Sequence, residues 1–108
     1  MDDKEIVMSK EIPAEYSLAQ NFPNPFNPST TFSYGLPERS KVLLEVYNTL
    51  GQIVATLVNS EQKAGYGSVN WIAKNGLGSG VYFYRLTASS VEQPGKTFVQ
   101  VWKMIVVK

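Results

Sequence analysis

The chain has 108 residues, a formal net charge of +1 and 44% hydrophobic residues, a composition typical of one globular domain with a single core. It has neither cysteine nor histidine, which excludes disulfides, thiolate nucleophiles, zinc–thiolate sites and histidine-based acid–base catalysis. No apolar run approaches the ~20 residues of a membrane span and no signal peptide is recognisable, which predicts either a cytosolic chain or a piece of a longer protein.

The charge is unevenly placed along the chain. Five of the nine acidic residues lie within the first fifteen positions, whereas eight basic and four acidic residues follow from position 16 onward. The basic residues are scattered singly, while nucleic-acid-binding proteins cluster them beside exposed aromatic rings. We therefore expect a solvated surface and no nucleic-acid partner.

Residues 1–11 are polar and charged without a clear period, and we expect a linker or tail there. An edge strand over residues 6–8 is the alternative. The domain itself is predicted over residues 12–108, and its first short strand over residues 16–20.

Residues 21–31 read NFPNPFNPSTT, a stretch through which no helix can run. Each proline fixes φ and lacks an N–H, and each residue before a proline is pushed toward extended geometry. The stretch therefore predicts a stiff, extended lead-in to a β domain, with both phenylalanine rings closing the end of a sandwich. A polyproline-type ligand for an aromatic groove is the alternative. This structural motif comprises Phe22, Pro23, Asn24, Pro25, Phe26, Asn27 and Pro28.

The rest of the chain alternates between strands and turns. Period-two patterns predict strands over residues 31–36, 41–48, 53–58, 66–72, 81–88 and 97–108. Turns are expected over residues 37–40, at 48–51 with Gly51 at positive φ, and at Pro94-Gly95, with a polar loop over residues 59–65. Phe32, Tyr34 and Leu36 are expected to share one face of their strand. Val42, Leu44 and Val46 are expected to share one face of the next. Strands spaced by about ten residues, without a helix, predict an all-β, immunoglobulin-like antiparallel β-sandwich of about seven strands.

Two patterns bear on possible chemistry. The glycines at 76, 78 and 80 suggest a phosphate loop, but no helix follows, so a turn that needs positive φ, at Gly80 in particular, is the better interpretation. A glycosidase needs two carboxyl groups about 5–10 Å apart in a cleft. Beyond the acidic start the chain offers only Glu38, Glu45, Glu61 and Glu92, mostly in turns. We expect no catalytic activity, no cofactor and no metal.

Aromatic side chains raise the alternative of a carbohydrate platform. The candidates are Tyr66, Trp71, Tyr82, Tyr84 and Trp102. Alternation places Tyr82 and Tyr84 with Leu86, which favours burial in a core over an exposed platform.

Four segments together resemble a known family. They read IPAEYSLAQNFPNPFNPSTTFSYGLPE (12–38), VYNTLGQIVATLV (46–58), LGSGVYFYRL (77–86) and KMIVVK (103–108). In this order they resemble the C-terminal sorting domains of the type IX secretion system, whose sandwich is similar to the immunoglobulin-like domain of flagellar hook-capping proteins.

The resemblance implies a function. Such domains end secreted proteins of the Bacteroidetes and related phyla, and the outer-membrane type IX machinery reads them. The domain would direct an N-terminal cargo in the same chain through the periplasm and outer membrane to the cell surface or medium, and would then often be cut off. It implies no small-molecule substrate. The alternatives are an immunoglobulin-like accessory or carbohydrate-binding module of a multidomain surface hydrolase, and a flagellar hook-cap module.

The resemblance also implies where the signal lies. The family ends in a Lys-Met-apolar-apolar-apolar-Lys pattern, matched here by Lys103, Met104, Ile105, Val106, Val107 and Lys108, and Lys108 is expected to be the natural C-terminus. A receptor could add a strand to an exposed edge there. The plainer interpretation is that Ile105 and Val107 pack the core.

Two departures from the family pattern stand out. Residues 89–97 lengthen a hairpin that is commonly short, and we expect this to change only a loop. Trp102 replaces a usual lysine, and an exposed tryptophan there would change the recognition face.

Overall fold

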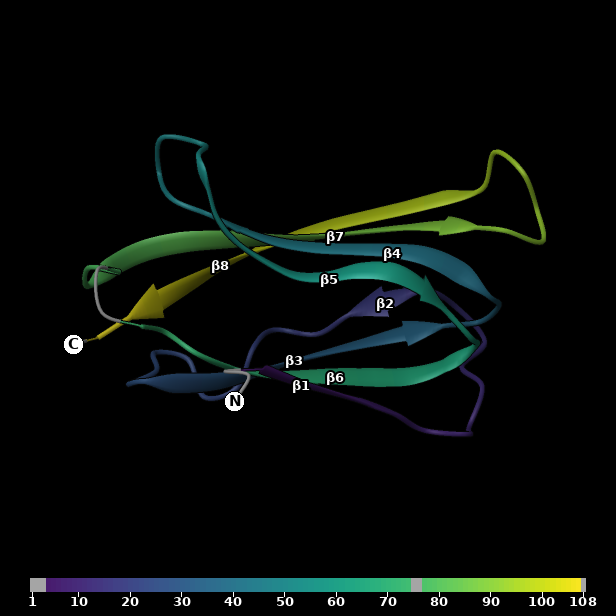
Figure 1. Cartoon of the computed structure of the whole chain (residues 1–108), viewed down its shortest axis with the longest axis horizontal. Helices are drawn as coiled ribbons and strands as arrows, with labels where there is room; N and C mark the ends of the chain where they lie inside the picture. Colours follow the sequence, from purple (N-terminus) through teal and green to yellow (C-terminus); the bar gives the residue numbers. More distant parts are fainter. Residues whose placement is uncertain (1–3, 75–76, 108) are drawn as a thin grey trace.

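The computed structural model describes residues 4–74 and 77–107, which form eight strands and, within these ranges, no helix. The strands make two four-stranded antiparallel sheets that face each other (Figure 1). Sheet A has the order β1 (Lys4–Met8), β6 (Gly65–Ile72), β3 (Ser29–Leu36) and β2 (Ser17–Leu18). Sheet B has the order β5 (Ile53–Gln62), β4 (Ser40–Tyr47), β7 (Gly80–Ser90) and β8 (Thr97–Val106). The predicted immunoglobulin-like β-sandwich is confirmed. A helix long and apolar enough to cross a membrane is not found in the described ranges.

The first strand, β1, lies within the segment expected to be a linker or tail. It pairs antiparallel with β6, from Lys4 opposite Trp71 to Met8 opposite Gly67. The pairing continues one residue further, where the Ser9 N–H donates to the Tyr66 carbonyl at 2.8 Å. The edge strand considered over residues 6–8 is therefore present, and it adds an eighth strand to the seven expected.

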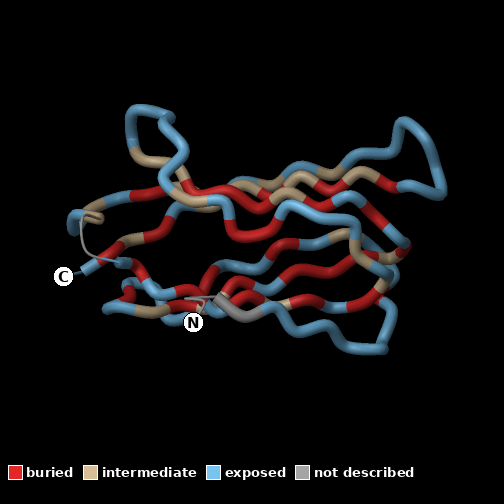
Figure 2. Tube along the Cα trace, viewed as in Figure 1, coloured by how far each residue is buried: buried red, intermediate tan, exposed pale blue. Residues whose placement is uncertain are grey.

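The core lies between the two sheets. The residues expected to share a face are buried together, on β3 at Phe32, Tyr34 and Leu36 and on β4 at Val42, Leu44 and Val46. The Phe32 ring meets the Tyr84 ring edge-on across the sheets, with centroids 4.7 Å apart. Figure 2 shows the buried residues along the facing strands and the exposed ones in the projecting turns.

One predicted loop is wrong. Residues 59–65 were expected to form a polar loop, yet β5 continues to Gln62 and only residues 63–64 link it to β6. These residues are polar because β5 is an edge strand of sheet B, where side chains face solvent. An irregularity in the β4–β5 pairing also lets two consecutive side chains, Leu57 and Val58, point into the core.

The positive φ expected at Gly51 and Gly80 is present, although Gly80 lies at the start of a strand rather than in a turn. Gly51 has φ of 82°, and its N–H donates to the Asn48 carbonyl at 3.0 Å. Gly80 opens β7 with φ of 145°, while position 76 lies outside the described residues. These two positions need glycine because an L side chain rarely adopts such φ values.

Candidate functional site

The terminal strand β8 divides its residues between two faces. Met104 and Val106 are buried in the core, whereas Lys103 and Val107 are exposed and Ile105 is half-buried on the outer side. The interpretation that Ile105 and Val107 pack the core is therefore wrong. The alternation has the opposite phase because Trp102 and Met104 face sheet A. Lys108 lies outside the described residues.

The proline stretch runs along the outer edge of this strand. The Ile105 N–H donates to Asn24 Oδ1 at 2.9 Å, and the Ile105 carbonyl accepts from the Phe26 N–H at 3.1 Å. The Val107 N–H donates to the Phe26 carbonyl at 2.9 Å, and Gln20 Nε2 donates to the Lys103 carbonyl at 2.9 Å. We call residues 103–107 the covered edge. A further strand cannot pair there without displacing these bonds.

Phe26 anchors this cover, and Phe22 does not. Phe26 is 2% exposed, and its ring centroid lies 6.1 Å from that of Trp71 on β6. Phe22 is 80% exposed, so its expected role in closing the sandwich is wrong. The backbone of Phe22 pairs with Thr31 through bonds of 3.1 and 2.9 Å. Side chains alternate along extended chain, and the neighbouring Asn21 is buried, so Phe22 points outward.

The prolines contribute backbone acceptors to the same region. The Pro23 carbonyl accepts from Thr30 Oγ1 at 2.8 Å and from Asn21 Nδ2 at 3.2 Å. The Pro28 carbonyl accepts from the Ala73 N–H at 2.8 Å. The peptide bonds before Pro23, Pro25 and Pro28 are cis. The stretch is therefore bound to its own domain through its backbone, which favours the structural interpretation over the polyproline ligand.

Two aromatic side chains of sheet B hold the chain that leads into this stretch. The Tyr84 hydroxyl donates to the Ala19 carbonyl at 2.8 Å and accepts from the Asn21 N–H at 2.7 Å. Burial raises the pKa of Tyr84 to about 12, against the opposing effect of the Asn21 N–H. Trp102 Nε1 donates to the Leu18 carbonyl at 2.8 Å. Trp102 is half-buried and packs against the core, so its ring is not presented as a fully exposed surface.

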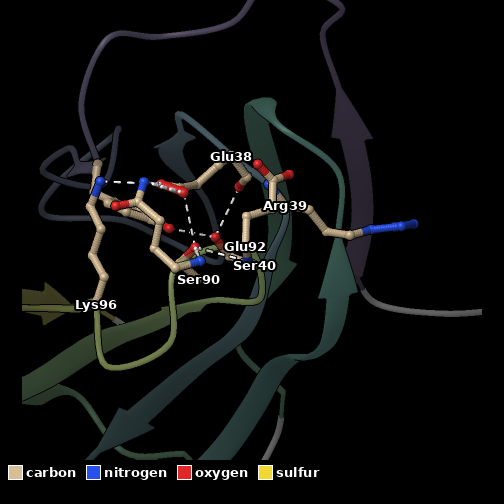
Figure 3. Close-up of polar contacts among 8 residues, drawn as sticks. Glu38, Arg39, Ser40, Ser90, Glu92 and Lys96 are labelled. Carbon is tan, nitrogen blue, oxygen red and sulfur yellow. Dashed lines mark hydrogen bonds and ion pairs between the residues drawn. The ribbon is translucent and has the colours of Figure 1, made fainter.

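The lengthened β7–β8 hairpin is fastened to the turn between β3 and β4 (Figure 3). The buried Glu38 carboxylate accepts from Ser90 Oγ at 2.9 Å, from Gln93 Nε2 at 2.8 and 2.7 Å and from Lys96 Nζ at 3.1 Å. Burial acts to raise the pKa of Glu38, but these hydrogen bonds and the Lys96 charge outweigh it and lower the pKa. The hairpin is thus a fixed part of the fold rather than a free loop.

On the outer face of sheet B, the carboxylate of Glu45 is already engaged. It accepts from the Tyr47 hydroxyl at 2.7 Å and pairs with Arg85 Nη2 at 3.3 Å. Arg85 also donates to the Tyr47 hydroxyl and lies 4.9 Å from the centre of its ring. Burial and the Glu45 hydrogen bond raise the pKa of Tyr47, with the Arg85 charge opposing them. Glu45 therefore serves a structural ion pair.

The aromatic residues do not form a shared platform. Trp71, Tyr82 and Tyr84 are buried, and of the five candidates only Tyr66 is exposed, on sheet A. No cluster of three metal-ligating side chains occurs in residues 4–74 and 77–107.

Sequence reasoning missed Gln20, which bonds to the covered edge, and Asn21 and Tyr84, which hold the chain beside it. Their bonds join positions separated by 63 to 83 residues. Alternation of side chains along one strand cannot predict contacts between residues so far apart in the sequence. The only signal was two consecutive amide side chains immediately before the first Phe-Pro.

Comparison with known proteins shows which family the chain belongs to. Residues 20–100 match the family model of the secretion system C-terminal sorting domain. The chain belongs to this family. The sorting domain also resembles part of a solved structure, dimeric latent PorU from Porphyromonas gingivalis, with 26% identity and a TM-score of 0.62. The likeness covers 88% of this chain but 10% of that one. No curated protein matches.

The predicted resemblance and its main consequence are thereby confirmed. The domain is a C-terminal signal for type IX secretion, which implies export across the outer membrane to the cell surface or medium. The family and the PorU likeness agree with the expected assignment to the Bacteroidetes. The matched range ends before Lys103, so the position of the signal within the strand stays a prediction.

Proposed function

We propose that this domain carries a cargo joined to its N-terminus in the same chain, and that it does so without catalysis of its own. The family is one of non-catalytic signals that act with the type IX machinery. The engagement of both buried carboxylates, Glu38 and Glu45, in ion pairs supports the same conclusion.

Over the covered edge, residues 103–107, the machinery reads side chains rather than backbone. The observation that carries this proposal is the covered edge, where Asn24, Phe26 and Gln20 bind the backbone of residues 103–107. The side chains of Lys103 and Val107 remain exposed, with Ile105 half-buried between them. Met104 and Val106 point to the opposite face of the strand and are buried in the core.

A reporter fused ahead of residues 1–108 and expressed in a type IX-competent bacterium tests both parts. The wild-type fusion should appear in the medium or on the cell surface. Lys103→Glu and Val107→Glu should each lower export about tenfold or more, because a reversed or added charge at a contact surface costs several kcal/mol. The exported fraction is measured by reporter activity in cells and medium.

Lys41→Glu is the matched control, because Lys41 is an exposed lysine on β4 of the same sheet. Its export should equal that of the wild type. Removal of residues 103–108 is less informative, since it also deletes the buried Met104 and Val106. If the wild-type fusion stays inside the cell, the cargo proposal fails. If Lys103→Glu and Val107→Glu are both exported normally, the signal lies elsewhere.

A further inference from the structure

The outer edge of β8 has a second half, residues 97–101, which we call the open edge. The N–H and C=O of Ile105 point away from β7, since both bond to the proline stretch. In an antiparallel strand every second residue directs these groups to the same side, so those of Val99 and Val101 also point outward. Within the described residues, none of these four groups has a hydrogen-bond partner.

The open edge lacks the features that usually prevent strand pairing. It contains no proline and no bulge, and it runs in unbroken register along β7. Its side chains Val99 and Val101 are 54% and 49% exposed. By contrast, β2 has only two residues, and β5 at the other side of sheet B carries an irregular register. The open edge therefore suits the addition of another strand.

A groove adjoins this edge on the outer face of sheet B. It holds about 350 Å³ and is lined by Tyr47, Phe83, Arg85, Val101 and three residues of the turn between β4 and β5: Asn48, Thr49 and Gly51. Figure 1 shows this turn, between β4 and β5, rising from the outer side of the sheet. Val101 belongs to both features, since its side chain lines the groove and its backbone faces the edge. Groove and edge thus form one continuous surface.

The charges of this surface are mainly positive. Arg85 lies opposite Val101 and Phe83 lies opposite Lys103, so both cations stand on neighbouring strands. The Arg85 side chain is 42% exposed and Lys103 is exposed, while Glu45 is buried and already paired with Arg85. A segment that binds here gains from carboxylates and from apolar side chains that contact the two valines.

We propose that the open edge accepts an extended segment of a receptor in the export machinery as an added strand of sheet B. That segment carries alternating apolar side chains and at least one carboxylate directed toward Arg85 and Lys103. This inference rests on the proposed function. The added backbone hydrogen bonds would hold the receptor, and the adjacent side chains of residues 103–107 would then give specificity.

Proline substitution at the edge tests the proposal in the reporter fusion. Val101→Pro removes an outward N–H that has no partner in the described part of the domain, so the fold should tolerate it while strand addition is blocked. Export should fall about tenfold or more. Ile6→Pro on β1 is the matched control, because Ser9 bonds to β6 and Ile6, three positions earlier, directs its N–H outward. Its export should be unchanged.

The outcomes separate this inference from the proposed function. If the wild type is not exported, the proposed function fails. If the wild type and Val101→Pro are exported equally, only the added strand is wrong. Urea unfolding of both proline variants shows whether a loss of export reflects a loss of stability, and the binding measurement below then decides.

The second measurement uses the purified chain and two capped octapeptides, one alternating Val with Glu and the other alternating Val with Lys. Amide NMR shifts of residues 97–101 should change with the Glu peptide and stay constant with the Lys peptide. Arg85→Gln combined with Lys103→Gln should abolish the response. The proposal is overturned if the Glu peptide leaves these amides unchanged. It is also overturned if they shift with protein concentration alone, which would show a second copy at the edge.

Discussion

The two halves of β8 share one strand and one neighbour, β7, but their outer edges differ. Over residues 103–107 the edge is bound by Asn24, Phe26 and Gln20, while over residues 97–101 it has no partner in the described chain. β8 pairs with β7 in unbroken register through both halves, so the strand itself does not create this contrast. The proline stretch decides which part of the edge another chain can reach.

The difference also separates two ways of being recognised. The covered edge leaves only side chains for a receptor, and its backbone is fixed by groups from the start of the domain. The open edge offers backbone donors and acceptors as well. We expect a receptor to use the first for specificity and the second for binding strength.

The largest effect on stability should come from Phe26→Ala, which removes the buried ring that anchors the proline stretch against the covered edge. Phe26 is fully packed against Trp71, so truncation should lower the free energy of unfolding by about 3–5 kcal/mol. Urea denaturation measures the loss. Phe22→Ala is the control in the same motif and should stay within about 0.5 kcal/mol, because its ring is exposed. Equal losses in the two variants would show that Phe26 is not the anchor.

A smaller effect is expected from Tyr84→Phe, which frees the chain leading into the cover. The variant loses a buried hydrogen bond to Asn21 and a partly buried one to Ala19, and should be less stable by about 1–3 kcal/mol in urea at neutral pH. An unchanged free energy of unfolding in Tyr84→Phe would contradict these two hydrogen bonds.

The same tyrosine should also give the wild type a distinct pH dependence. Its pKa is about 12 in the folded protein against an ordinary 10.0, so the folded state binds the proton more tightly. The corresponding stability is complete below pH 10.0 and is lost as the pH rises toward 12. Tyr34, whose pKa burial also raises, is present in both proteins, so the difference between wild type and Tyr84→Phe isolates Tyr84.

The smallest effect is expected from Asn24→Ala, which removes the acceptor of the Ile105 N–H. Hydrogen exchange at Ile105 should become about 2–10-fold faster, the equivalent of about 0.5–1.5 kcal/mol. Asn27→Ala, an exposed asparagine of the same stretch, should leave that rate unchanged. In the wild type, Ile105 should exchange more slowly than Val99 and Val101, and equal rates would remove the contrast between the two edges.

Local patterns predicted most of the fold and part of the site. Alternation correctly grouped the apolar residues around Phe32 on β3 and Leu44 on β4, and it placed Tyr84 on β7 in the core, because every second side chain of a half-buried strand faces inward. The turn at Gly51 was predicted correctly as well, since its positive φ favours glycine. The polar residues 59–62 were misjudged, because polarity at an edge strand looks like polarity in a loop.

The sequence by itself determined that this is an all-β domain of the sorting family, with a proline stretch that no helix or central strand could contain. Only the tertiary structure decided that Phe26 is buried and Phe22 exposed, and that Met104 and Val106 rather than Ile105 and Val107 face the core. Only it showed that the proline stretch closes one half of the last strand and leaves the other open. The physical reason is distance along the chain. The bonds that cover the edge join residues 79 to 83 positions apart, and no local rule of propensity or period extends that far.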